Sequence, residues 1–269
     1  AIGMTEEAAT TVYGNYTSLA VPMFNMPPYL IYPISYSIIP ILTMARGAGD
    51  RVRANRIMES SLRVAVLIGL PCALGMATMS KPILSLFYKA QSVDMAWPLL
   101  TLLAPSTFFV CMLSVTNAIL QANGFERKPL YSMLVGAVVK IISNYFLLYA
   151  VGMYGTPIST FLCYLTATAM NLYFVAKNVG VMPKIGRVFV KPLIASVLCS
   201  AAALGCYTLL TGPLSMSGRI PTLLSIFAAV IVYVPLIFLL RAVTADDILL
   251  LPKGGKILTI LKRFRLVRE

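Results

Sequence analysis

Lys140 is the residue whose type and position point most directly to chemistry, because it lies in the middle of a long apolar stretch, residues 130–151. An ammonium group at mid-membrane costs about 2.5–3.5 kcal/mol, so it should face a cavity or a partner rather than lipid. Helical spacing places small and polar side chains on its face, namely Ser132, Gly136, Ser143 and Asn144. We therefore expect Lys140 to be a counter-charge for an anionic group such as a phosphate.

Two neighbouring apolar stretches carry similar polar stripes. At helical spacing, Ser106, Val110, Ser114, Asn117 and Gln121 share one face, and Thr160, Tyr164, Thr168 and Asn171 share another. Three consecutive helices with such stripes predict a shared hydrated cavity. Packing between membrane helices is the alternative, because hydroxyl and small residues often join helices there. The predicted cavity residues are Lys140, Asn144, Ser143, Asn117, Gln121, Ser114, Thr168 and Asn171.

The remaining reactive residue types argue against an enzyme. All nine acidic residues lie in loops, at termini or near helix ends, so no apolar stretch carries the buried carboxylate of a typical ion-coupled pump. The five cysteines lie in apolar stretches, and the sequence has no histidine and no phosphate-binding GxxxxGK[ST] loop. We therefore predict no catalytic residue, no metal site and no cofactor.

Seven apolar stretches must position these side chains. Hydrophobic residues make up 59% of the chain and charged residues only 12%, about half the share that coats a soluble domain. Each stretch is long enough to cross a bilayer as a helix, and the sequence predicts an all-α integral membrane protein. The stretches are residues 16–45, 62–88, 96–121, 130–151, 156–176, 190–210 and 220–240. Five prolines in the first predict a bent or broken helix.

The basic residues predict an orientation. Eighteen of the 22 lie in alternate loops and the C-terminal segment, as the positive-inside rule requires of cytoplasmic segments. This places the N-terminus outside and the C-terminus in the cytoplasm, and it explains the net charge of +13 without a nucleic-acid partner. The predicted parts are an extracellular segment (1–15), a seven-helix lobe (16–240) and a basic amphipathic tail on anionic membrane lipids (241–269).

Several motifs resemble those of one transporter superfamily. The run YGNYTSLAVPMFNMPPYLIYPISYSIIPIL (13–42) resembles the start of the C-terminal lobe of polysaccharide-export flippases. Similar likeness extends to RIMESSLRVAVLIGLPCALG, NAILQANGFERKPL, GAVVKIISNYFLL and DDILLLPKGGKIL. The chain thus resembles the multidrug/oligosaccharidyl-lipid/polysaccharide (MOP) exporters, and among them the stage V sporulation protein B group and the lipid II flippases. Because the chain starts at Ala1, we expect a fragment or a processed half.

The resemblance implies one lobe of a fourteen-helix, MATE-like transporter in the bacterial cytoplasmic membrane. Its missing N-terminal lobe would be a partner, and an undecaprenyl-linked saccharide would be the substrate, moved by alternating access. Lys140 and Asn144 match the GAxxKI pattern and its continuation, so the resemblance also makes them cavity candidates. A small-molecule cation antiporter of the same superfamily and a non-transporting membrane scaffold are the alternatives.

Overall fold

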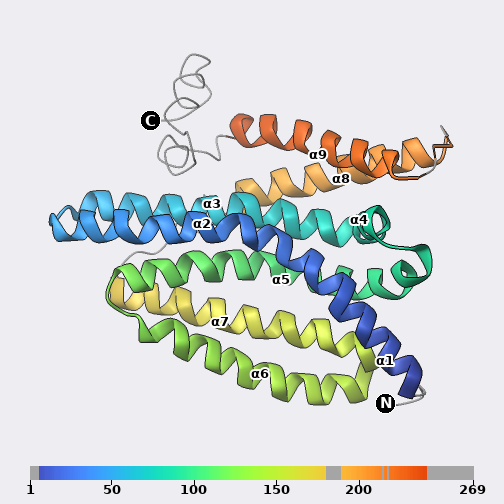
Figure 1. The fold of residues 1–269 in the computed structure, drawn as a ribbon. Coiled ribbons are helices and arrows are strands. Elements are labelled where there is room, and N and C mark those ends of the chain that lie inside the picture. The colour runs from blue at the N-terminus through green and yellow to red at the C-terminus, as the bar shows by residue number, and fades with distance from the viewer. Residues whose placement is uncertain (1–5, 180–188, 214, 217, 241–269) are drawn as a thin grey trace.

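The structure is a computed structural model that describes residues 6–179, 189–213, 215–216 and 218–240. All of the long elements in these residues are helices. Figure 1 shows the long helices lying side by side in one bundle. The first rod joins α1 (Glu6–Asn15), a π-helical turn (Tyr16–Ala20) and α2 (Val21–Gly47). The others are α3 (Arg51–Thr78), α5 (Ala90–Ala122), α6 (Arg127–Val151), α7 (Gly155–Val179), α8 (Lys191–Thr211) and α9 (Ile220–Leu239). The predicted tail, 241–269, lies outside the described residues.

Seven long helices in the described part of the chain match the seven predicted stretches. By length and composition alone there are six candidate membrane spans, because residues 127–179 form one uninterrupted helical run. That run doubles back through a 3-10 turn (Gly152–Tyr154), where Gly152 has a φ of 62°, a value that favours glycine. As a result α6 and α7 lie side by side as a hairpin (Figure 1).

The second predicted span is divided in the structure. The α3 helix already begins at Arg51, where the Asp50 carboxylate caps it by accepting a hydrogen bond from the Arg53 backbone N–H at 2.9 Å. It ends at Thr78, and a separate short helix, α4 (Ser80–Phe87), follows. Pro82 explains the break, since it has no N–H to continue the helical ladder. Apolar residues continue through α4, so hydropathy alone merged the two helices.

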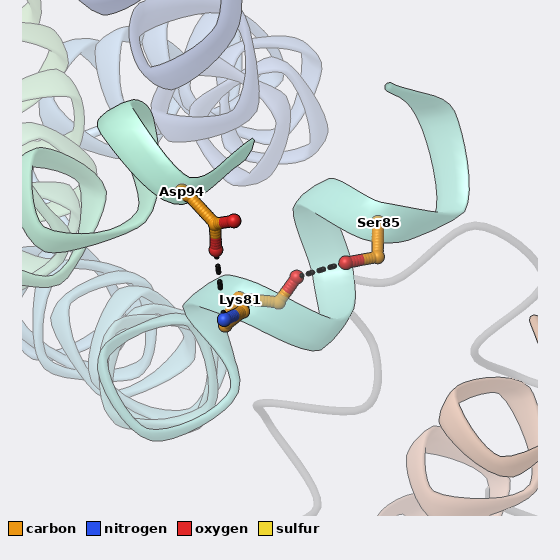
Figure 2. Close-up of polar contacts among 3 residues, drawn as sticks. All are labelled: Lys81, Ser85 and Asp94. Carbon is orange, nitrogen blue, oxygen red and sulfur yellow. Dashed lines mark hydrogen bonds and ion pairs between the residues drawn. The ribbon is translucent and has the colours of Figure 1, made fainter. Parts of the chain in front are cut away.

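An exposed ion pair joins α4 to α5. The Lys81 ammonium lies 2.8 Å from an Asp94 carboxylate oxygen, and the Ser85 hydroxyl donates to the Lys81 carbonyl at 2.8 Å (Figure 2). Both charged side chains are more than half exposed, so water screens the pair and it adds little stability. It lies at the end of the bundle that carries few basic residues.

The first rod is bent rather than broken. It keeps helical structure from Glu6 to Gly47, although α2 contains Pro27, Pro28, Pro33 and Pro40, and Figure 1 shows it turning as it runs toward α1. Each internal proline removes one backbone donor, so the bend is expected. Residues 6–15, predicted to precede the first span, extend this rod as α1.

A hydroxyl replaces the donor that Pro71 lacks in α3. In a regular helix the N–H of residue 71 would bond to the Leu67 carbonyl. Here the Tyr233 hydroxyl of α9 donates to that carbonyl at 2.6 Å. The bond shows how a hydroxyl from a neighbouring helix satisfies a carbonyl that proline leaves without its donor. It also attaches α9 to α3.

Close helix contacts fix the two sides of the bundle. A Cβ atom added to Gly136 of α6 would lie 2.8 Å from the Cys163 carbonyl oxygen of α7, so only glycine permits this approach. On the other side α8 packs on α3 and on α9. Figure 1 shows the α8–α9 hairpin and the α6–α7 hairpin on opposite sides of α3 and α5.

Basic residues gather at one end of the bundle. The α2–α3 turn and the α5–α6 turn lie at the same end in Figure 1, as does the last turn of α7. Arg46, Arg51 and Arg53 flank the first of these turns, Arg127 and Lys128 begin α6, and Lys177 is in the last turn of α7. We call this the basic end. Its clustering agrees with the alternation seen in the sequence.

Candidate functional site

Two hollows follow one face of the bundle, with α5 beneath them, the first rod on one side and the α6–α7 hairpin on the other. The larger, which we call the Lys140 hollow, has a volume of about 660 Å³ and includes residues of α1, α2, α5, α6 and α7. The smaller, the Asn117 hollow, has a volume of about 330 Å³ and lies nearer the basic end. Tyr164 of α7 lines both hollows.

Lys140 and Asn144 lie one helical turn apart on the same wall of the Lys140 hollow. The Ser159 hydroxyl of α7 lies 3.1 Å from the Asn144 side-chain oxygen, and it is shared with the Thr156 carbonyl of its own helix at 2.8 Å. Hydroxyls and a further amide complete the polar part of the wall, from Thr10, Tyr13, Tyr16, Thr17, Asn25, Thr156, Thr160 and Tyr164. An ammonium group in a wall that also carries hydroxyls and amides can bind the oxygens of an anion.

A buried amide positions Asn117 in the smaller hollow. Asn171 of α7 is fully buried, and its amide nitrogen donates to the Asn117 side-chain oxygen at 2.6 Å and to the Thr116 hydroxyl at 3.2 Å. Asn117 thus keeps its own amide nitrogen available to the hollow. Ser114 donates to Ser35 of α2 at 2.8 Å, a bond that joins α5 to the first rod. Gln121, Tyr32 and Tyr36 add further polar lining.

The predicted cavity residues therefore separate into lining and supporting positions. Lys140 and Asn144 line one hollow, and Ser114, Asn117 and Gln121 line the other. The structure places the other three elsewhere. Thr168 and Asn171 are enclosed at the contact between α5 and α7, where Thr168 donates to the Phe109 carbonyl at 2.9 Å, and Ser143 donates to the Val139 carbonyl of its own helix at 2.6 Å.

Sequence reasoning missed the contribution of the first rod. Asn25 lines the Lys140 hollow, and Tyr32, Ser35 and Tyr36 line the Asn117 hollow. A signal was present, because positions 32, 35 and 36 share a helical face and interrupt an otherwise apolar run. Ser159 gave no such signal, since its partner Asn144 lies across the hairpin and is fixed by tertiary packing.

Charge distinguishes the two hollows. Among the described residues that line them, Lys140 is the one charged side chain, and no carboxylate lines either hollow. The Asn117 hollow is lined by neutral hydroxyls, amides and aromatic rings together with apolar side chains. The face can therefore offer an anion site beside a neutral polar site.

The comparison with known proteins supports the interpretation of this chain as a transporter-like membrane protein. The MatE family model matches residues 17–146. The chain is 23% identical over 267 residues to the "Uncharacterized membrane protein YabM" of Bacillus subtilis (strain 168). This match covers 97% of this chain and 49% of that protein. It is 21% identical over 162 residues to "Lipid II flippase MurJ" of the same organism, covering 60% of this chain and 30% of that protein.

Solved structures share the fold. The inward-facing conformation of a multidrug resistance MATE family transporter of the MOP superfamily superposes with a TM-score of 0.53 at 18% identity. The match covers 93% of this chain and 61% of that one. The chain thus has the fold of MATE/MOP superfamily transporters and spans about half the length of YabM and about a third of MurJ.

Proposed function

We propose that this chain is the C-terminal lobe of a fourteen-helix flippase that carries an anionic, lipid-linked saccharide across the bacterial cytoplasmic membrane. The observation that carries the proposal is the charge of the two hollows, in which Lys140 stands without any lining carboxylate. A site of this kind binds an anion and disfavours a cation. An uncompensated positive charge attracts the anion and repels the cation, and both effects are stronger at low dielectric.

The two hollows suit the two chemical parts of such a substrate. A phosphate group would bind Lys140 and the amide of Asn144, and neighbouring sugar hydroxyls would bind the neutral amides and hydroxyls around Asn117. The undecaprenyl chain would stay in the bilayer. The similarity to a protein named as a lipid II flippase supports this substrate class, as does the sequence resemblance to the stage V sporulation protein B group.

The missing N-terminal lobe would cover the open side of the hollows in this proposal. Transport would then follow alternating access, with the two lobes rocking so that the hollows open to one face of the membrane at a time. We propose that the basic end faces the cytoplasm, because cytoplasmic loops are enriched in lysine and arginine. Residues 1–15 would then lie at the outer face and the tail, 241–269, on the inner leaflet.

A charge-swap series in the full-length protein tests the function. Lys140→Ala should abolish complementation of a flippase-deficient bacterial strain, and Lys140→Arg should retain part of it, because the charge is kept while the geometry changes. Lys89→Ala, which removes an exposed charge away from both hollows, is the matched control and should complement fully. Full growth with membrane-inserted Lys140→Ala protein would remove Lys140 from the mechanism.

Cation antiport is the second candidate, because the solved neighbours include multidrug MATE transporters. It requires an acidic residue in the cavity, which would have to come from the other lobe. Resistance to cationic drugs without any effect on wall synthesis would favour it. A membrane scaffold is the third candidate, and it receives support from Thr168 and Asn171, which pack helices together. Protection of a cysteine at Ser114 from water-soluble reagents would favour the scaffold.

A further inference from the structure

An aromatic contact lies where the two hollows meet. Tyr164 of α7 lines both, and its ring centroid lies 6.0 Å from that of Phe24, which belongs to α2. Phe24 is 3% exposed, and it lines the Lys140 hollow on the opposite wall from Tyr164. The pair therefore joins the α2 wall to the α7 wall where the hollows meet, and polar residues line the hollows on either side of it.

The helix beneath the pair carries two hydroxyls at this boundary. Leu103 lines the Lys140 hollow and Val110 the Asn117 hollow, and helical spacing puts Ser106 and Thr107 on the same face between them. Both of these side chains are fully buried, and neither hydroxyl has a hydrogen-bond partner among the described residues. Buried hydroxyls without a partner are unfavourable, so this stretch would be more stable when wetted.

We propose that Tyr164 and Phe24 form a septum that divides one polar track into two compartments, with the Tyr164 ring deciding which ligands pass. This inference rests on the proposed function, in which one substrate occupies both hollows. With the rings in contact, an anion at Lys140 is separated from the neutral compartment around Asn117. With the rings apart, Ser106 and Thr107 join the track, and a ligand can extend along its whole length.

Tyr164 is the residue of the pair to change. Phe24 belongs to the buried apolar cluster at its end of the bundle, whereas Tyr164 is only half-buried and packs against that cluster from outside. Loss of an aromatic contact of this type should raise the fraction of molecules in which the two walls are apart by a factor of about 2 to 10. Complete removal of the Tyr164 ring should open the track further, since nothing then faces Phe24.

Thiol labelling from the basic end tests the septum. The full chain is reconstituted into proteoliposomes, and a cysteine in place of Val52, an exposed residue of the basic end, reports which face the reagent meets. The membrane-impermeant, anionic reagent 2-sulfonatoethyl methanethiosulfonate, which the Lys140 charge does not repel, is added to that face. Cysteines are placed singly at Asn117, before the septum, and at Asn144, beyond it. The parent chain, with its five native cysteines, gives the background rate.

Tyr164→Ala should raise the labelling rate at position 144 by at least about fivefold and leave position 117 within about twofold. Tyr164→Leu should do the same if the alanine variant folds poorly. Tyr164→Phe keeps the ring and should match the parent, as should Tyr36→Ala, which removes a ring from the Asn117 hollow alone.

An unchanged rate at position 144 in both the alanine and the leucine variants would overturn the septum. An equal rise at positions 117 and 144 would also overturn it, because the barrier would then lie elsewhere. None of these rates depends on Lys140 binding a substrate. Failure of the complementation series therefore leaves the septum standing, and failure of the labelling leaves the proposed substrate class standing.

Discussion

Replacing Tyr233 by phenylalanine should release α9 from α3 more often, because it leaves the Leu67 carbonyl without a donor. Pro71 cannot supply the helical N–H to this carbonyl, and the Tyr233 hydroxyl now donates to it at 2.6 Å. In water a freed carbonyl would bond to solvent. Within a bilayer that alternative is missing, so the substitution removes a bond that nothing nearby replaces.

The size of the effect follows from membrane-protein hydrogen bonds. Double-mutant cycles give about 0.6 kcal/mol on average and about 1.7 kcal/mol at most for such bonds. These energies correspond to an increase of about 3- to 18-fold in the population of the detached state. The upper half of this range is expected here, since Leu67 itself is buried and its carbonyl would stay unpaired.

The chain contains a native reporter for detachment. Cys199 of α8 is 7% exposed, and its thiol donates to the Ala229 carbonyl of α9 at 3.2 Å, so it becomes more accessible when α9 moves away from α3 and α8 together. Labelling rates at Cys199, followed by mass spectrometry of the protein in lipid, should rise about 3- to 18-fold in Tyr233→Phe. Tyr207→Phe, which removes a hydroxyl from α8, is the control and should leave the rate unchanged.

A second substitution isolates the cause. Pro71→Ala restores the helical N–H that bonds to the Leu67 carbonyl, so Tyr233→Phe should then change the Cys199 rate by less than about twofold. If Tyr233→Phe raises the Cys199 labelling rate equally in the parent chain and in the Pro71→Ala variant, this explanation is refuted. That result would assign the contribution of Tyr233 to packing and not to the carbonyl that proline frees.

Two further substitutions test contacts that fix the bundle. Gly136→Ala should destabilise the protein by about 1–3 kcal/mol, because the added carbon would overlap the Cys163 carbonyl oxygen. Gly75 has open space around it, so the control Gly75→Ala should be neutral or stabilising by up to about 1 kcal/mol. Denaturation midpoints in mixed micelles decide this, and equal effects would contradict the close contact. Asp94→Asn should lower stability by less than about 1 kcal/mol, since its ion pair with Lys81 is exposed (Figure 2), and a larger loss that persists at high salt would contradict that view.

Helix number and position could be predicted because bilayer thickness and loop charge constrain them. The predicted stretch 220–240 corresponds to α9 at Ile220–Leu239, and 130–151 corresponds to α6 at Arg127–Val151. The break between α3 and α4 was missed, because Pro82 directly follows Lys81 inside a run that remains apolar to Phe87. A hydropathy average smooths over such a short interruption.

The site could be predicted only in part, because helical spacing shows which residues share a face but not what that face meets. Ser132 and Gly136 share the face of Lys140, yet both are buried, and Gly136 lies against α7. Lys140 and Asn144, one and two turns further on, line the hollow. The difference arises from where α7 contacts α6 and where the first rod bends, and both depend on tertiary packing.

Ligand preference for phosphate tests the central claim, that Lys140 makes this face an anion site. Thermal stabilisation of the full chain in detergent would be measured with undecaprenyl phosphate and with undecaprenol, which has the same chain without the phosphate. We predict stronger stabilisation by the phosphate in the parent and in Lys89→Gln, and loss of that preference in Lys140→Gln. Equal stabilisation by both lipids in the parent, or a phosphate preference that survives in Lys140→Gln, would contradict the claim.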